Sequence, residues 1–154
     1  MQPLVLKLGG NVGLDPAHVN LIATELKAVL AAGHEVTIVH GGGPQLDQAI
    51  AALGEAVTKV DGLRVTSPAA ADVVLRVMDD IGAGLATQLR AQGLPATHLP
   101  ARERAMHAVP KRLPNGDLQR VGTVTRFDGK AQHGHLLVVT PVGFDAVGPL
   151  NVNA

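Results

Sequence analysis

Two stretches decide the fold: residues 3–10 read PLVLKLGG, and residues 35–44 read EVTIVHGGGP. Each is a short apolar run, typical of a strand, that ends in consecutive glycines. Glycine at a strand end has no Cβ, adopts positive φ readily and lets backbone N–H groups approach a ligand closely. If a helix starts just after such a turn, its free N–H groups and its dipole favour an anion. The two turns therefore predict two anion-binding positions, one of them beside Lys7.

The segment between the two turns has the signals of a helix. Asp15 and Pro16 are typical of a helix start. Apolar residues then recur at helical spacing over residues 17–32, and Gly33 is well placed to end the helix. A strand, a helix and a second strand in about 35 residues predict parallel strands joined by a right-handed crossover.

The rest of the chain predicts an α/β domain with a β-hairpin near residues 105–125, because Asn115-Gly116 lies between alternating segments. We expect helices over 45–53 and 68–92, the second one broken near Gly82 and Gly84, and a short polar helix around 126–132. Residues 3–8, 57–60, 95–99 and 135–141 are expected to be strands, with 3–8 and 135–141 buried, and residues 142–154 a loop that enters a site.

Composition excludes several classes of function. Hydrophobic residues make up 46% of the chain and aromatic residues 1%, so the core must be built from Val, Leu, Ile and Ala, as in a sheet flanked by helices. A formal net charge of +0 does not support a broad surface for nucleic acid or anionic lipid. The absence of cysteine excludes thiol chemistry and disulfides. Without an apolar run of about 18 residues or room for a signal peptide, we expect a cytoplasmic protein with no membrane span.

The two glycine turns supply the first candidate site residues. Lys7 comes at the carboxyl end of the first strand, where ligands bind in open α/β sheets, although an edge lysine that reaches the surface is the alternative. The three glycines at 41–43 exceed what a tight turn needs and predict a nest for a carboxylate or a phosphoryl group. We interpret His40 as a structural hydrogen-bonding residue rather than a catalytic base.

Two later segments supply the others. Arg64 lies in the mostly apolar stretch GLRVT at 62–66 and could hold a carboxylate through two parallel bonds; a solvated surface arginine is the alternative. Asn151 and Asn153 alternate in an extended stretch, so both side chains could donate to a substrate, while an ordinary loop is the alternative. The histidines have no metal-binding spacing, and we predict no metal site.

In order and spacing these segments resemble the amino-acid kinase family, and within it the acetylglutamate kinase branch. The matching pieces span nearly the whole chain: KLGG at 7–10, HGGGP at 40–44, GLRVT at 62–66, Val121-Gly122 and NVNA at 151–154. The nearest alternative is the kinase of carrier-bound aminoadipate or glutamate in lysine synthesis, which differs at the arginine and asparagine segments.

The resemblance implies a three-layer αβα sandwich with a mainly parallel central sheet. It implies transfer of the γ-phosphoryl of ATP, as its Mg²⁺ complex, to the side-chain carboxylate of N-acetyl-L-glutamate, a step of arginine biosynthesis. Lys7 would be catalytic. The phosphoryl group would be held by Gly9, Gly10 and Gly42, and the substrate by Gly42, Gly43, Arg64, Asn151 and Asn153.

One departure from the family pattern matters. In the family an Asp follows the position of Ala154, and the nucleotide-binding half lies beyond it. Residues 1–154 are therefore expected to form the N-terminal lobe, which binds acetylglutamate and joins two copies in a homodimer, without the C-terminal ATP-binding lobe. We expect this chain alone to bind ATP poorly and to have little or no kinase activity. A complete, non-catalytic binding or dimerisation module is the alternative.

Overall fold

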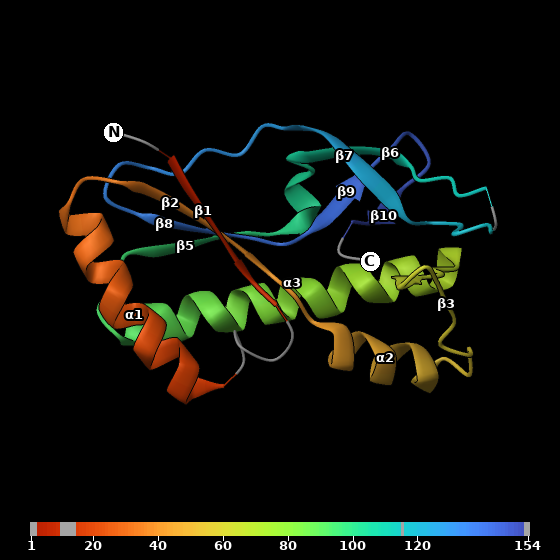
Figure 1. Cartoon of the computed structure of the whole chain (residues 1–154), viewed down its shortest axis with the longest axis horizontal. Helices are drawn as coiled ribbons and strands as arrows, with labels where there is room; N and C mark the ends of the chain where they lie inside the picture. The colour runs from red at the N-terminus through yellow and green to blue at the C-terminus, as the bar shows by residue number, and fades with distance from the viewer. Residues whose placement is uncertain (1–2, 10–14, 115, 153–154) are drawn as a thin grey trace.

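The computed structural model describes residues 3–9, 15–114 and 116–152 (Figure 1). The predictions for Gly10, Asn153 and Ala154 lie outside these residues. The helices are α1 (Pro16–Ala31), α2 (Gly43–Ala52) and α3 (Pro68–Ala91), with a short 3₁₀ turn at Ala101–Glu103. The strands are β1 (Pro3–Leu8), β2 (Glu35–His40), β3 (Lys59–Val60), β4 (Leu63–Arg64), β5 (Ala96–Leu99), β6 (Met106–Pro110), β7 (Gly122–Phe127), β8 (Leu136–Val139), β9 (Val142–Phe144) and β10 (Pro149–Asn151).

A parallel sheet, here called sheet A, has the strand order β1-β2-β8-β5. The crossover through α1 makes β1 and β2 neighbours, with Leu8 opposite His40. Asp15 caps α1 by accepting a hydrogen bond from Ala17 N (2.9 Å), and Pro16 follows in the first turn. The predicted α/β class with a parallel central sheet is thus confirmed.

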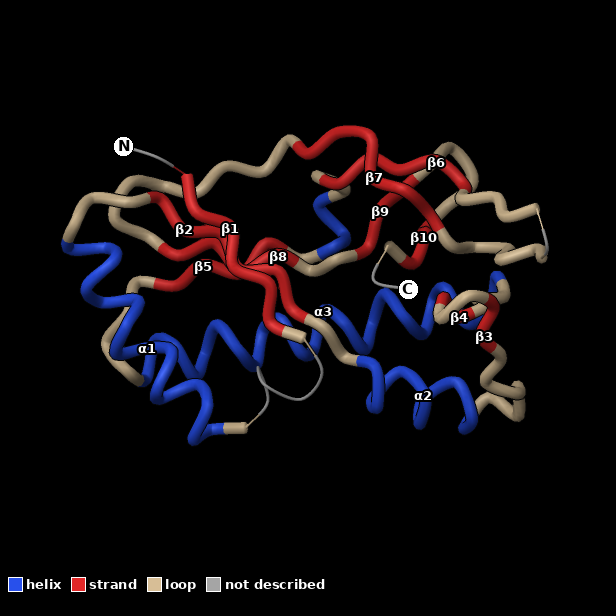
Figure 2. Tube along the Cα trace, in the orientation of Figure 1, coloured by secondary structure: helices blue, strands red, loops and turns tan. Residues whose placement is uncertain are grey.

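The main hydrophobic core lies between one face of sheet A and the helices α1 and α3 (Figure 2). Val36, Ile38, Leu136 and Val138 project from the sheet into this core because alternate strand residues share a face. The helix residues that meet them are Val19, Ala23 and Leu26 of α1 and Leu85, Ala86 and Leu89 of α3. Their burial fixes the height of α3 relative to the strand ends.

Helix α3 continues beyond sheet A and also supports a second sheet with the order β10-β9-β6-β7. Strands β6 and β7 form the predicted antiparallel hairpin. A second core cluster, which contains Leu46 and Ile50 of α2, joins α2 to Val74 and Met78 of α3. The molecule is therefore organised along one long helix that reaches both sheets (Figure 1).

Several predictions of local structure were wrong. Helix α3 runs unbroken through Gly82 and Gly84 because its apolar face is buried over its whole length. Arg126 is in strand β7, paired with His107 of β6, and no helix covers 126–132. Residues 142–151 form β9 and β10 rather than a loop.

Strand β1 is also less buried than expected. Leu4 is 42% and Val5 67% exposed, since β1 ends sheet A in the described chain and its outer face looks onto an open cavity. No described helix is long and apolar enough to cross a membrane.

Candidate functional site

The two glycine turns lie side by side at the carboxyl edge of sheet A. Gly41 N–H donates a hydrogen bond to Leu8 O (2.6 Å), which joins the end of β1 to the end of β2. Gly9 directly follows this bond, and Lys7 precedes it with an exposed side chain. The Lys7 side chain reaches the surface from an edge strand, and an exposed ammonium carries little desolvation cost. Lys7 makes no ion pair with any described residue and remains available to an anion at this edge.

The second turn leads directly into α2. Gly42 is the N-cap and Gly43 the first residue of this helix, and in the described part of the chain the N-cap makes no side-chain capping bond to the first N–H groups. A Cβ at Gly42 would lie 2.6 Å from Ile81 Cδ1 and 2.9 Å from Met78 Sδ, both on α3. Gly42 is thus required by its close approach to α3, whereas a Cβ at Gly43 would meet nothing within 4 Å. The turn presents an uncapped helix N-terminus, which favours an anion.

Arg64 approaches the same turn from β4. Its side chain is only 5% exposed, so the alternative of a solvated surface arginine is excluded. Nη2 donates to Gly43 O (3.1 Å), Nε donates to Asp47 Oδ1 (3.0 Å), and Nη2 also forms an ion pair with Asp47. Nη1 has no partner among the described residues. Asp47 thus occupies the Nε–Nη2 edge of the guanidinium, and Nη1 is the nitrogen left for a ligand.

A chain of hydrogen bonds links Arg64 to Asn151. Thr66 Oγ1 donates to Arg64 O (3.0 Å), and Asn151 Nδ2 donates to Thr66 Oγ1 (3.2 Å) although the two residues are 85 positions apart. Thr66 and Asn151 are 0% and 1% exposed. A buried side-chain amide needs partners, which explains its fixed orientation. Residues 62–66 and the strand that ends at Asn151 are therefore joined in the fold, although they are far apart in the sequence.

Sequence reasoning missed the ion pair that holds this junction. Arg120 N donates to Thr66 O (2.8 Å) and Arg120 O accepts from Asn151 N (2.9 Å). Its guanidinium donates to both oxygens of Asp145 (2.8 and 3.0 Å) and to Pro149 O (3.1 Å). These bonds hold the pKa of Asp145 well below its ordinary value, chiefly through Arg120. The only sequence signal was the position of Arg120 directly before Val121-Gly122.

His40 is the most buried ionisable group at the second turn, at 1% exposure. Its Nδ1–H donates to Gly41 O (3.2 Å), as the interpretation as a structural hydrogen-bonding residue implies. Nε2 is buried and has no hydrogen-bond partner in the described part of the chain. Burial lowers the pKa of His40, because the charged ring would lose its hydration. The ring is therefore neutral near pH 7.

Together these contacts form a continuous path from Lys7 to Asn151 through Leu8, the glycine turn, Arg64 and Thr66. Along it lie an exposed ammonium, a helix N-terminus with a glycine N-cap, a buried guanidinium whose Nη1 has no described partner, and a buried amide. This arrangement suits a ligand with negative charge at two points. Among the residues that the structure describes, no group of three or more His, Asp or Glu is placed to hold a metal ion.

Comparison with known sequences gives consistent results. Residues 2–153 match the amino acid kinase family. The acetylglutamate kinase of Solibacter usitatus is 35% identical over 158 aligned residues, which cover 98% of this chain and 61% of that protein. The acetylglutamate kinase of Bifidobacterium adolescentis is 34% identical over 167, which cover 99% of this chain and 52% of that protein. The chain thus spans between about half and three fifths of the length of these relatives.

Comparison with solved structures supports the fold. N-acetylglutamate synthase from Neisseria gonorrhoeae, complexed with coenzyme A and N-acetyl-glutamate, has a TM-score of 0.76 at 19% identity, covering 97% of this chain and 36% of that one. A protein of Streptococcus mutans has a TM-score of 0.80 at 24% identity, covering 97% and 62%. Carbamate kinase from Giardia lamblia bound to AMP-PNP has a TM-score of 0.53 at 15% identity, covering 99% and 62%.

Proposed function

The chain belongs to the amino acid kinase family, and on this premise we propose that it forms the acetylglutamate-binding half of a kinase. The reaction would move the γ-phosphoryl group of ATP, supplied as its Mg²⁺ complex, to the side-chain carboxylate of N-acetyl-L-glutamate. The observation that carries the proposal is Arg64, a buried guanidinium whose Nη1 has no partner among the described residues, beside the N-terminus of α2. The names of the relatives at 35% and 34% identity support the substrate.

The proposed chemistry makes modest demands on the protein. A carboxylate is already a nucleophile, so no strong base is required, and catalysis rests on alignment and on neutralising charge at the phosphoryl oxygens. Arg64 would hold the α-carboxylate of the substrate through Nη1. Asn151, oriented by Thr66, would bind its amide or carboxylate. These contacts would direct the side-chain carboxylate toward the glycine turns.

The transferred phosphoryl group would lie between the two turns. The N–H groups of Gly42 and Gly43 at the start of α2 would face its oxygens, with Gly9 on the other side. Lys7, exposed at the same sheet edge, would stabilise the charge that spreads over those oxygens in the transition state. Gly10 and Asn153 would join the phosphoryl and substrate sites respectively.

The relatives are longer than this chain, and we propose that the nucleotide binds to the part of them that this chain does not cover. The chain alone would bind acetylglutamate and transfer little phosphoryl, as a cytoplasmic homodimer in arginine biosynthesis. A chain that binds acetylglutamate and releases ADP at the rate of an intact relative would contradict the division of labour but leave the substrate assignment standing.

The test is calorimetric titration of N-acetyl-L-glutamate into the chain and into its Arg64→Ala variant. We expect specific binding by the parent and a loss of at least about 30-fold in affinity in the variant, because losing one partner of a buried charged pair typically costs about 2–5 kcal/mol. Arg126→Ala is the matched control, since Arg126 is exposed and paired only at the surface. Unchanged affinity in Arg64→Ala, or tighter binding of free glutamate than of acetylglutamate, would overturn the assignment.

A further inference from the structure

Helix α3 carries a notch at Gly82 that holds two histidine rings. A Cβ at Gly82 would lie 2.5 Å from His98 Nε2 and 2.9 Å from His40 Nε2. The two rings come from the ends of β5 and β2, and both ring nitrogens converge on the space that this glycine leaves. Any side chain at position 82 would therefore displace the residue from which the glycine turn starts.

The hydrogen bonds of His40 determine where its proton lies. Gly41 O accepts only, so Nδ1, at 3.2 Å from it, must carry the hydrogen. In the neutral ring Nε2 then carries no proton, and it is buried without a hydrogen-bond partner among the described residues. A second proton on Nε2 would create a buried cation facing His98, whose own Nε2 is 2.9 Å from Thr140 Oγ1.

The bond from His40 to Gly41 sets the direction of an N–H group at the site. A trans peptide unit is planar, so the C=O of Gly41 and the N–H of Gly42 point in opposite directions in one plane. Fixing Gly41 O through His40 therefore also fixes the direction of the Gly42 N–H. Gly42 itself is packed on Met78 and Ile81 of the same helix, next to the notch.

We propose that His40 is a positioning residue for the glycine turn. As a neutral ring in the Gly82 notch it orients the Gly41–Gly42 peptide toward the ligand, and a second proton on Nε2 in acid, which buries a cation beside His98, moves the ring and disturbs that orientation. The proposal rests on the proposed function only for the identity of the ligand. The orientation of the glycine turn by His40 does not depend on which ligand binds, and it can be measured without a ligand.

The charges around the two rings agree with a neutral pair. Burial is the largest influence on both groups and lowers the pKa of each. Asp79 of α3 acts on both in the opposite direction, but its Oδ1 accepts from Ala101 N (2.7 Å) and contacts neither ring through a hydrogen bond. The remaining charged groups that act on His98 are Arg90, Arg102 and Glu103.

Because burial lowers the pKa of His40, acid should destabilise the folded chain. Because the folded pKa lies below the ordinary value of 6.5, the folded chain takes up the proton less readily than the unfolded chain. The contribution of neutral His40 to stability is therefore complete above about pH 6.5 and is lost as the pH falls below it. The orientation of the turn should weaken only at the lower pH at which the folded chain itself takes up the proton.

The first experiment is long-range ¹H–¹⁵N NMR on the ¹⁵N-labelled chain between pH 8 and pH 5, with free histidine in the tube as the reference. We expect the Nδ1–H tautomer of His40, protonation at a lower pH than the free amino acid, and movement of the Gly41, Gly42 and Gly43 amide signals in step with it. A proton on Nε2 at pH 7.5 would overturn the proposal, and so would amide signals of Gly41, Gly42 and Gly43 that do not change as His40 titrates.

The second experiment compares two glycines of α3. Gly82→Ala should shift the amide signals of Gly42 and Gly43 and weaken acetylglutamate binding at least about tenfold at pH 7.5. Gly84→Ala, where a Cβ meets nothing within 4 Å, should leave both unchanged. Circular dichroism checks that both variants fold. Equal effects of the two substitutions, or no effect of Gly82→Ala, would contradict the claim that the space at Gly82 positions His40.

A third variant separates positioning from packing. His40→Asn keeps an N–H donor near the position of Nδ1 but cannot take up a proton, so it should preserve the glycine signals and abolish their acid shift. His40→Phe fills the notch without a donor and should disturb the turn at every pH. If the parent fails to bind acetylglutamate, the proposed function falls, while these NMR results still decide the role of His40.

Discussion

At the scale of single residues, the site is organised around an arginine that already has an anionic partner. Asp47 accepts from Nε of Arg64 and is 39% exposed, whereas Arg64 is 5% exposed. A buried guanidinium without a counter-charge is strongly destabilising, which explains why a carboxylate lies beside it. The same carboxylate would repel an acidic substrate. Asp47 therefore stabilises the fold and lowers the affinity of the site for an acidic substrate.

These two opposing effects of Asp47 predict that a neutral residue at this position lowers stability but increases the stabilisation by substrate. Asp47→Asn keeps an acceptor oxygen but removes the charge, so the chain should lose stability, and a substrate carboxylate should restore more of it than in the parent. We expect a larger increase in melting temperature on adding acetylglutamate than the parent shows, measured by differential scanning fluorimetry at matched ligand concentrations. Asp72→Asn, an exposed carboxylate of α3, is the control for charge alone. A smaller increase in Asp47→Asn would mean that Asp47 supports the ligand.

Residue identities were predictable where a local pattern implied them. Gly42, Gly43 and Arg64 follow from short motifs, and the structure connects all three. Sequence patterns did not single out Asp47, Arg120 or Asp145. Each of these residues acts through a partner distant in sequence, and a charged residue taken alone is usually predicted to lie on the surface. Their roles depend on tertiary pairing, which periodicity and spacing do not encode.

At the scale of elements, two short strands depend on one side chain. Arg120 joins Thr66, which follows β4, to Asn151 of β10 through its backbone, and it fixes the 145–149 turn through its guanidinium. It is 14% exposed and Asp145 is 15% exposed, so solvent screens the pair only weakly. Asn151 is thus held in place by an ion pair outside the site.

Replacing Arg120 by Lys keeps the charge but loses the fork that meets both oxygens of Asp145. We expect the free energy of unfolding to fall by about 1–3 kcal/mol in urea at pH 7, with weaker acetylglutamate binding. Arg126→Lys, in the exposed pair with Asp128, should have no measurable effect. Because the folded pKa of Asp145 is depressed, the difference should persist above about pH 4 and shrink as the pH falls below it. A difference that grows in acid would contradict the pairing.

Element prediction succeeded for α1, α2 and the parallel strands, whose caps and apolar runs are local. It failed at Gly82 and Gly84 because helix propensity penalises glycine, whereas the buried face of α3 stabilises the helix and the notch at Gly82 requires one. It failed at β9 and β10 because these strands are short, and their pairing depends on distant partners.

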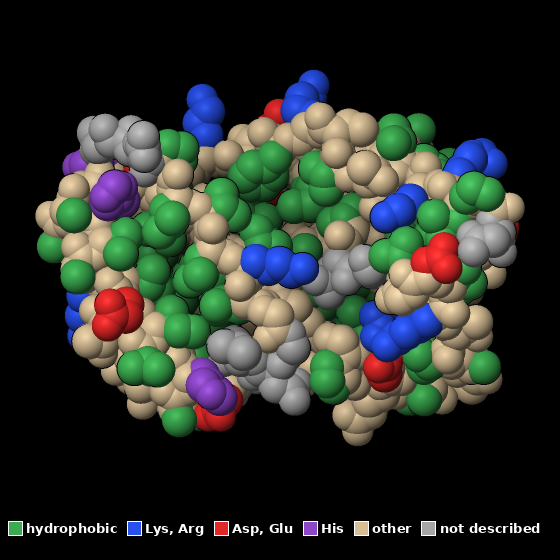
Figure 3. Space-filling model, viewed as in Figure 1, with side chains coloured by type: hydrophobic (Ala, Val, Ile, Leu, Met, Phe, Trp, Pro, Cys, Tyr) green, Lys and Arg blue, Asp and Glu red, His purple; other side chains and the backbone are tan. Residues whose placement is uncertain are grey.

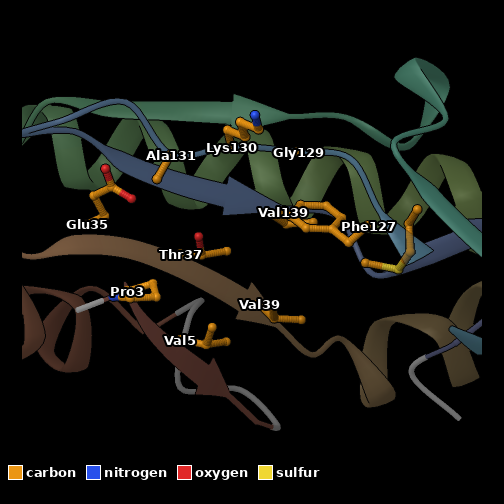
Figure 4. A pocket seen from close by; sticks show the side chains of 11 residues that line it. Pro3, Val5, Glu35, Thr37, Val39, Phe127, Gly129, Lys130, Ala131 and Val139 are labelled. Atoms are coloured by element: carbon orange, nitrogen blue, oxygen red, sulfur yellow. The ribbon is translucent and has the colours of Figure 1, made fainter. Parts of the chain in front are cut away.

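At the scale of the whole molecule, sheet A is covered unequally. Its inner face packs on α1 and α3, while Val5, Thr37 and Val39 on the outer face border a cavity of about 410 Å³ (Figure 4). Phe127 and the segment 129–131 form the opposite wall. Figure 3 shows apolar side chains gathered in a hollow on this side of the molecule. A parallel sheet normally buries both faces, so this surface is unusually apolar for one in contact with water.

The hollow should bind a small apolar dye. We expect the native chain to enhance the fluorescence of anilinonaphthalene sulfonate, and Val5→Asn to reduce that enhancement at least about twofold, because Val5 lines the cavity. Val147→Asn is the matched control, since Val147 is 83% exposed and does not line it. Equal signals from the parent and Val5→Asn, with unchanged circular dichroism, would show that the dye binds elsewhere.

The contrast between Gly42 and Gly43 has a consequence for how this turn can vary among descendants of the chain. Ile81 and Met78 crowd position 42, so a change there requires a compensating change in α3, and the two sites should drift as a linked set. Position 43 has open space, so the fold itself tolerates a methyl group there. If alanine at 43 is nonetheless rejected by selection, the pressure comes from what approaches the turn from outside. A saturation library across positions 41–43 would separate the architectural constraint from the chemical one.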